Sequence, residues 1–288
     1  MAARDMTRAL GGRWYGHYGI ARCPAHPDKT PSLSLADGRD GRLLVRCHAG
    51  CANLDVLAFL RKHGMQSNFW PERPIRIFSQ APPDDEERCR KALRIWEMGV
   101  PIEGTLAEDY LAHRACLAPW PSTLIARAWC AEARSELPAL AAAVVRGGSI
   151  CAVHRTFLQV PGRKADVFKP RLMLGRAKGS AVPLSDKARS LAICEGLEDG
   201  LAVRDALPNV EVWAATSAPM LAAVEMPSYI RDVVIGADAD AAGQKAAARL
   251  AEVCAGRGIS CRIMLPPDGA KDFNEVAQRA AEAGVRRA

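Results

Sequence analysis

Two stretches decide the fold: Ile193–Asp199 reads ICEGLED, and Val233–Asp240 reads VVIGADAD. Each is an apolar run with strand character that ends in carboxylates and leads into a helix-forming stretch. In an open α/β sheet, the carboxyl ends of parallel strands line one crevice. We therefore expect Glu195, Asp238 and Asp240 to lie together there, although 43 positions separate Glu195 from Asp238.

Carboxylates gathered at one point repel each other unless a cation lies between them, and Mg²⁺ or Mn²⁺ is the usual cation. Such a constellation suits phosphoryl-transfer chemistry. A structural alternative exists for each acid. Asp238 and Asp240 could be a helix N-cap and a surface charge, and Asp199 could be a first-turn charge favoured by the helix dipole.

The surrounding sequence alternates strand and helix patterns. The predicted strands are Leu191–Cys194, Val210–Ala214, Val233–Ala237 and Cys261–Leu265. The predicted helices are Glu198–Ala206, Pro219–Val224, Ala241–Ala255 and Asn274–Ala283. This regular order predicts an α/β fold with a Rossmann-like parallel sheet and right-handed crossovers.

Cysteine and histidine cluster near the N-terminus, in CPAH at 23–26 and CHAGC at 47–51. Two short-spaced pairs on either side of a small strand pair are typical of a structural Zn²⁺ site, since each turn supplies two ligands. The predicted ligands are Cys23, His26, Cys47 and Cys51, with His48 as an alternative fourth ligand. The other seven of the ten cysteines are scattered singly, which favours a metal site in a reducing compartment over disulfides.

The composition is that of a globular protein, with 49% hydrophobic and 25% charged residues in 288. We predict a first domain at 12–65, a Pro-rich and acidic linker at 66–85, a mixed α+β middle domain at 86–188 and a last domain at 189–288. Residues 1–10 lack a signal-peptide core, and no apolar run approaches the roughly 18 residues of a membrane span. We therefore expect a cytoplasmic protein with no membrane partner.

The middle domain carries much of the positive charge. Residues 150–190 contain nine Lys/Arg against two Asp, an excess equal to the net charge of +7 of the whole chain. A solvated face is the ordinary explanation of such a stretch. Because it directly precedes the predicted carboxylate site, we favour a surface that binds phosphate. Its candidate nucleic-acid and nucleotide contacts are Arg155, Arg163, Lys164, Lys169, Arg171 and Lys178.

The acidic motifs resemble those of a known domain. Glu195-Gly196-x-x-Asp199 followed by Asp238-x-Asp240 is similar to the Toprim domain shared by DnaG-type primases, topoisomerases and certain nucleases. Residues 267–275, PDGAKDFNE, resemble the acidic element after the fourth strand in primases. Asp272 matches its first acidic position, while Asn274 replaces the second acid. The resemblance implies that an Asp at 274 is tolerated.

The N-terminal motif resembles the same family. Residues 23–35, CPAHPDKTPSLSL, are similar to the zinc ribbon of these primases, although the second knuckle has three residues between cysteines rather than two. A zinc ribbon first and a Toprim domain last is the order found in DnaG-type primases of bacteria, phages and plasmids. The middle domain, with Arg155-Thr156, Gly162–Lys164 and Lys169–Arg171, looks like their basic subdomain.

The resemblance implies a DNA primase, a DNA-directed RNA polymerase that makes short RNA primers on single-stranded DNA. Asp238, Asp240 and Asp272 would bind Mg²⁺ or Mn²⁺, and Glu195 would be either a further ligand or the base. Partners would be single-stranded DNA, NTPs and a separate replicative helicase, since no P-loop motif occurs. Two alternatives stand: a metal-dependent Toprim nuclease, and a non-catalytic DNA-binding module of a mobile element.

Overall fold

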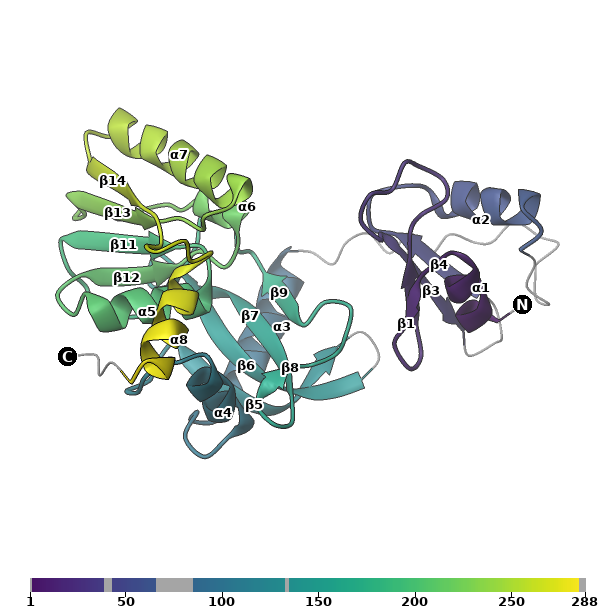
Figure 1. Ribbon diagram of the computed structural model, residues 1–288, viewed down its shortest axis with the longest axis horizontal. Helices are drawn as coiled ribbons and strands as arrows, with labels where there is room; N and C mark the ends of the chain where they lie inside the picture. Colours follow the sequence, from purple (N-terminus) through teal and green to yellow (C-terminus); the bar gives the residue numbers. More distant parts are fainter. Residues whose placement is uncertain (1, 39–42, 66–84, 133–134, 285–288) are drawn as a thin grey trace. The chain divides into compact units, whose positions relative to one another are not determined.

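We describe the chain from a computed structural model (Figure 1). It describes residues 2–38, 43–65, 85–132 and 135–284. The chain divides into two compact units, Met1–Gln80 with Asp166–Phe168, and Ala81–Ala165 with Lys169–Ala288. Apart from Asp166–Phe168, the residues of the predicted middle and last domains all belong to the second unit. The predicted linker at 66–85 lies almost wholly outside the described residues.

The first unit is a small antiparallel sheet with two helices. Its strands follow chain order, β1 (Arg13–Trp14), β2 (Gly19–Ala21), β3 (Leu33–Asp37) and β4 (Leu43–Cys47). Helices α1 (Ala3–Ala9) and α2 (Asn53–Lys62) share its core with the strands, through side chains such as Met6, Leu33, Leu35 and Leu60. β4 ends at Cys47, so the sheet places this cysteine beside the turn that follows.

The second unit contains an antiparallel sheet, preceded in the chain by α3 (Asp85–Glu97) and α4 (Leu106–His113). Its strands run in the order β5-β6-β7-β8, and β9 also pairs with β7. The bounds are β5 (Leu124–Glu132), β6 (Ser135–Arg146), β7 (Ser149–Gln159), β8 (Arg163–Lys164) and β9 (Arg171–Gly175). β8 and β9 bring the middle of the basic segment onto the edge of β7.

An alanine-rich run forms the centre of β6, although Ala favours helix. Residues 139–144 are at most 1% exposed, because strands flank β6 on both sides and helices cover both faces. Alternate residues point to opposite faces. Ala141 packs with Ala92 of α3, whereas Leu140 and Ala142 belong to the large core that includes α4. Burial on both faces therefore outweighs local propensity.

The second sheet of this unit is parallel except at one edge. Its order is β10-β12-β11-β13-β14, with β10 antiparallel to β12. The bounds are β10 (Val182–Pro183), β11 (Ser190–Cys194), β12 (Glu211–Ala214), β13 (Asp232–Gly236) and β14 (Ser260–Met264). The helices are α5 (Leu197–Ala206), α6 (Ala218–Leu221), α7 (Ala241–Gly256) and α8 (Phe273–Glu282). The predicted α/β fold with a parallel sheet is confirmed.

Helices cover both faces of this parallel sheet (Figure 1). On β11, Ala192 and Cys194 pack with residues of α5 and α8, while Leu191 and Ile193 pack with residues of α6 and α7. The first of these cores also contains residues of the antiparallel sheet and α4. The carboxyl edge of the parallel sheet therefore lies in the same unit as the basic strands. No helix among the described residues is long and apolar enough to cross a membrane.

Candidate active site and zinc centre

The carboxyl edge of the parallel sheet carries the predicted acidic residues. Cys194, the last residue of β11, pairs with Gly236, the last residue of β13. Glu195 and Asp238, which follow these strands, therefore emerge at the same edge. Asp240 precedes α7 and Asp272 precedes α8. The structure thus brings all four predicted catalytic acids to one edge of the sheet.

The acids perturb one another electrostatically. Burial, together with the negative charges of Glu195, Asp272 and Asp240, raises the pKa of Asp238 to about 6. Burial also raises the pKa of Glu195, with Asp240 and Asp199 acting in the same direction. Mutual repulsion of this kind makes the cluster a favourable place for a cation.

One carboxylate oxygen of this cluster has no partner. Asp238 Oδ1 is buried and accepts no hydrogen bond. A buried acceptor left without a donor is costly unless something outside the chain satisfies it. Hard carboxylate oxygens are the ligands that Mg²⁺ and Mn²⁺ prefer. The orphaned oxygen and the donor set together fit one of these ions.

Asp240 and Asp272 also cap helices. Asp240 Oδ1 accepts a hydrogen bond of 2.7 Å from Gly243 N at the start of α7, and Asp272 Oδ1 accepts one of 2.7 Å from Glu275 N at the start of α8. The helix N-cap that we considered as an alternative role for this pair of acids is therefore present at Asp240. It does not compete with metal binding, because each cap uses one oxygen and a carboxylate has two.

Two glycines make room for the acids. A Cβ at Gly243 would lie 3.0 Å from both Cβ and the backbone oxygen of Asp238. A Cβ at Gly196 would lie 2.1 Å from Asp199 Oδ2. Any larger residue at Gly196 would therefore displace the Asp199 carboxylate, which gives a steric reason for glycine directly after Glu195.

Asp199 is a buried member of the acidic cluster, and not simply a charge in the first turn of a helix. It is 7% exposed, and its Oδ1 accepts a hydrogen bond of 2.9 Å from Asn274 N. Burial, together with the charges of Asp272 and Asp238, raises its pKa to about 7. The Glu195-Gly196-x-x-Asp199 spacing was the signal in the sequence.

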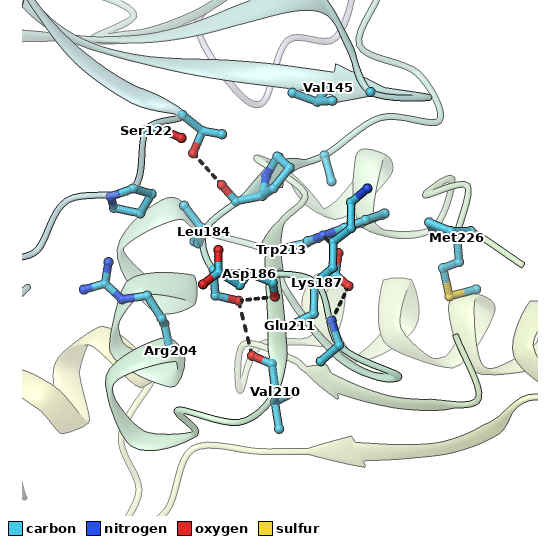
Figure 2. A pocket seen from close by; sticks show the side chains of 18 of the residues that line it. Ser122, Val145, Leu184, Asp186, Lys187, Arg204, Val210, Glu211, Trp213 and Met226 are labelled. Atoms are coloured by element: carbon cyan, nitrogen blue, oxygen red, sulfur yellow. Dashed lines mark hydrogen bonds between the residues drawn. The ribbon is translucent and has the colours of Figure 1, made fainter. Parts of the chain in front are cut away.

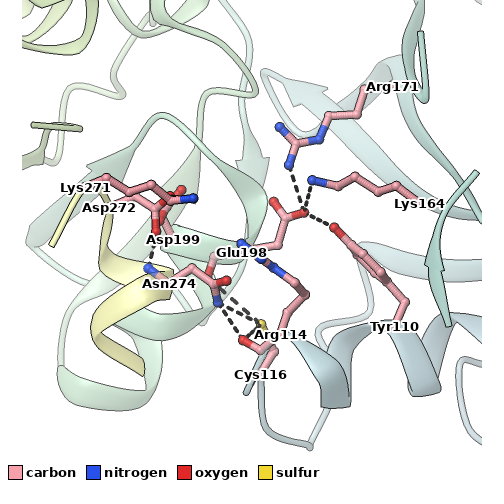
Figure 3. Close-up of polar contacts among 10 residues, drawn as sticks. All are labelled: Tyr110, Arg114, Cys116, Lys164, Arg171, Glu198, Asp199, Lys271, Asp272 and Asn274. Carbon is pink, nitrogen blue, oxygen red and sulfur yellow. Dashed lines mark hydrogen bonds and ion pairs between the residues drawn. The ribbon is translucent and has the colours of Figure 1, made fainter. Parts of the chain in front are cut away.

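Asn274 joins α8 to the end of α4. It is 1% exposed, and its Nδ2 donates a hydrogen bond of 2.6 Å to the backbone oxygen of Arg114 (Figure 3). An ionised Asp would place an oxygen against that carbonyl. The expectation that Asp is tolerated at 274 therefore does not fit this environment, because the site requires a donor.

Glu198 is the functional-site neighbour that sequence reasoning missed. It is 3% exposed, and its Oε1 accepts hydrogen bonds from Tyr110 of α4 and from Arg171 Nη2 at 3.0 Å. Lys164 Nζ lies 3.6 Å from the same oxygen (Figure 3). Burial opposes ionisation of Glu198, but Arg171 and then Lys164 lower its pKa to about 2. No motif in the sequence pointed to this contact.

The predicted phosphate contacts fall into three groups. Lys164 and Arg171 pair with Glu198. Arg155 is 7% exposed, lies 5.5 Å from the ring centroid of Phe157 and donates to Cys130 Sγ at 3.8 Å, so its guanidinium faces the interior. The remaining three are exposed, namely Arg163, Lys169 and Lys178.

The first unit gathers the predicted zinc ligands. The ligand atoms of Cys23, His26, Cys47 and Cys51 all lie within 4.8 Å of one another, and His48 is not one of this set. His26 Nδ1 is 3.2 Å from Cys51 Sγ and 3.9 Å from Cys47 Sγ. Sulfur atoms around tetrahedral Zn²⁺ are about 3.8 Å apart, given Zn–S bonds of about 2.3 Å. The cluster therefore fits Zn²⁺.

Asp28 supports this cluster from behind. Its Oδ1 is 3.7 Å from His26 Nε2, the ring nitrogen that faces away from the sulfur atoms. Its Oδ2 accepts hydrogen bonds of 2.6 Å from both Cys23 N and Ser32 Oγ. A carboxylate behind a ligating histidine fixes the ring orientation. Among the described residues, no other group of three or more possible metal ligands is as compact as the Cys/His cluster.

A pocket of about 1450 Å³ lies elsewhere, beside the segments that precede β11, β12 and β13 (Figure 2). It is therefore at the amino ends of these strands, away from the carboxylate edge. Its buried acid, Glu211, accepts hydrogen bonds from Ala188 N, Trp213 Nε1 and Tyr229 OH. These three donors satisfy the Glu211 carboxylate.

Comparison with known protein families gives two matches along the chain. Residues 190–283 match the family model described as the Toprim domain, and residues 86–184 match a domain of unknown function (DUF7146). Comparison with curated proteins gave no match.

Solved primase structures show limited similarity to the chain. The Aquifex aeolicus primase, comprising zinc-binding and RNA polymerase domains, is 14% identical with a TM-score of 0.45, over 100% of this chain and 82% of that one. The primase fragment of the bacteriophage T7 primase-helicase is 15% identical with a TM-score of 0.39, over 65% and 70%. A DnaG catalytic core is 15% identical with a TM-score of 0.44, over 70% and 78%.

The family model and the carboxylate edge coincide. The matched range begins with β11 and ends after α8, so it contains Glu195, Asp238, Asp240 and Asp272. The resemblance predicted for this part of the sequence is confirmed. Residues 190–283 are a Toprim domain.

Proposed function

We propose that the protein is a DNA primase that synthesises short RNA primers on single-stranded DNA. The observation that carries this proposal is the orphaned Asp238 Oδ1 within a cluster of acids at the edge of a Toprim domain. The basic strands β8 and β9 lie in the same compact unit, and Arg171 is close enough to Glu195 to lower its pKa against the effect of burial. Carboxylates and cations side by side suit a nucleoside triphosphate with its metal.

Each acid has a defined part in this proposal. Asp238, Asp240 and Asp272 would hold Mg²⁺ or Mn²⁺, which when bound neutralises charge on the triphosphate. Glu195 either shares this ligand set or accepts the proton of the attacking 3′-hydroxyl, and its raised pKa suits a base. Asp199 and Gly196 keep the start of α5 in place behind Glu195.

The zinc ribbon and the basic residues would bind the polymeric and nucleotide substrates. Cys23, His26, Cys47 and Cys51 would hold structural Zn²⁺, and the ribbon would contact the template. The exposed cations Arg163, Lys169 and Lys178 would contact phosphate groups. Unwinding would fall to a separate replicative helicase.

Incubation with circular single-stranded DNA, Mg²⁺ and labelled NTPs tests the proposal. Short labelled RNA that is sensitive to alkali is the expected product. Linearised or shortened DNA without labelled RNA would identify a Toprim nuclease instead. Binding of the DNA with neither product, in Mg²⁺ and in Mn²⁺, would identify a non-catalytic DNA-binding module.

A further inference from the structure

Glu198 lies in α5, the helix that follows Glu195, but its side chain contacts a different part of the unit from that of Asp199. It is in the first turn of α5, three residues after Glu195 and next to Asp199. Asp199 contacts α8 through Asn274, whereas Glu198 contacts α4, β8 and β9 (Figure 3). The first turn of α5 therefore joins the Toprim sheet to the antiparallel sheet.

All three contacts of Glu198 converge on one oxygen. Tyr110 OH, Arg171 Nη2 and Lys164 Nζ all approach Oε1. Lys164 Nζ is also 5.9 Å from the ring centroid of Tyr110, so the ring packs against the same ammonium group. Lysine and arginine side chains are otherwise flexible, and contact with a buried carboxylate restricts where their charged ends lie.

The two cations are anchored on one side and open on the other. The Glu198 side chain is 4% exposed, whereas that of Lys164 is 32% exposed and that of Arg171 is 43% exposed. The carboxylate thus lies beneath them and leaves an outer surface of each cation accessible. Two positive charges against one negative charge leave an excess that can attract a further anion.

We propose that Glu198 is a positioning residue that orders Lys164 and Arg171 beside the carboxylate edge for the triphosphate of an incoming nucleotide. This inference rests on the proposed function. Side chains that are already ordered before binding lose little conformational entropy when the ligand binds, so the affinity is higher. A carboxylate that merely neutralised the two cations would have the opposite effect and weaken nucleotide binding.

Glu198→Gln separates these possibilities, because it keeps the shape of the side chain and removes its charge. Affinity for a fluorescent, non-hydrolysable ATP analogue is measured by anisotropy in Mg²⁺, which requires no catalysis. We expect binding about tenfold weaker than in the unchanged protein. In primer synthesis, we expect a similar rise in KM for NTP and a smaller change in kcat.

The matched control is Glu211→Gln. Glu211 is also a buried glutamate, 2% exposed with three hydrogen-bond donors, but it lies at the start of β12 beside the pocket of Figure 2. A general effect of losing a buried carboxylate would appear in both variants, whereas we expect nucleotide affinity to change only in Glu198→Gln. Circular dichroism verifies that both are folded.

Tyr110→Phe keeps the proposal testable if Glu198→Gln does not fold. It removes one donor to Oε1 and leaves the charges in place, and we expect about threefold weaker nucleotide binding. If Glu198→Gln folds and binds the nucleotide as tightly as the wild-type protein or more tightly, the inference is overturned, even if the wild-type protein makes primers. If Glu198→Gln does not fold, unchanged nucleotide binding by Tyr110→Phe overturns it in the same way. Absence of primers from a protein whose nucleotide binding depends on Glu198 would instead overturn the proposed function alone.

Discussion

Replacing Asn274 by Asp should make stability depend on pH. In the structure, Asn274 Nδ2 donates to the backbone oxygen of Arg114 at 2.6 Å in a setting that is 1% exposed. A protonated Asp could donate the same hydrogen bond, whereas an ionised Asp could not. We therefore expect the pKa of the new carboxyl to be raised in the folded protein, since burial and the nearby Asp199 both disfavour its charge.

The magnitude follows from the lost donor and from proton linkage. Below about pH 4, where the new carboxyl is protonated in both the folded and the unfolded state, we expect the variant to be less stable by ~1–2 kcal/mol, the cost of an imperfect buried hydrogen bond. Between the unfolded and the folded pKa, each pH unit removes up to about 1.4 kcal/mol, because the unfolded chain ionises first. The loss should therefore grow with rising pH, to ~3–4 kcal/mol at pH 7.

Urea unfolding at pH 5 and pH 7, followed by circular dichroism, measures this difference. Asn209→Asp is the control, since Asn209 is exposed and undergoes the same chemical change. We expect the control to match the unchanged protein at both pH values. If Asn274→Asp is as stable as the wild-type protein at pH 7, the role assigned to the Asn274 side-chain amide is refuted.

Three further outcomes are expected. The purified wild-type protein should contain one zinc per chain, and Cys51→Ser should lose both the zinc and the fold of the zinc ribbon. Wild-type protein without zinc would contradict this prediction. Because the pKa of Asp238 is raised to about 6, the stability that its protonated form contributes is present below about pH 4 and is lost as the pH rises through 6. Mg²⁺ should therefore raise Tm more at pH 8 than at pH 5. Equal shifts in Tm at the two pH values would contradict the metal site. Replacing Arg163 and Lys178 together by Ala should lower the salt slope of single-stranded DNA binding by about 0.7 per lost contact, whereas an unchanged slope would make this segment an ordinary solvated face.

The parallel sheet could be predicted from sequence because its signals are local. Apolar runs that end in acids gave β11 and β13 within one residue of their ends, and the long helices α5, α7 and α8 also agree within one residue. Parallel pairing then brings Glu195 and Asp238 to one edge without further information. The zinc ligands could also be predicted from the sequence, since two short spacings place four ligands on two turns.

The remaining features depend on packing between distant segments. Tyr110 and Glu198 are 88 positions apart, and their contact requires α4 to pack beside the first turn of α5. The strand β6 reads locally as helix because of its alanines, and only burial on both faces makes it a strand. Arg155 was predicted at a surface, but its strand β7 is central and covered, so its side chain is buried.

The carboxylate edge is most directly tested by comparing Asp238→Asn and Asp240→Asn with Asp232→Asn in primer synthesis. Asp232 is an exposed residue at the amino end of β13, so the control makes the same chemical change at the opposite end of the strand. Loss of a charged metal ligand removes several kcal/mol of stabilisation of the transition state, which corresponds to a rate lower by ~10²–10³-fold. We predict this loss in Asp238→Asn and Asp240→Asn, with folding and DNA binding retained, and a normal rate in Asp232→Asn. Near-normal primer synthesis by folded Asp238→Asn and Asp240→Asn would contradict the assignment of the active site.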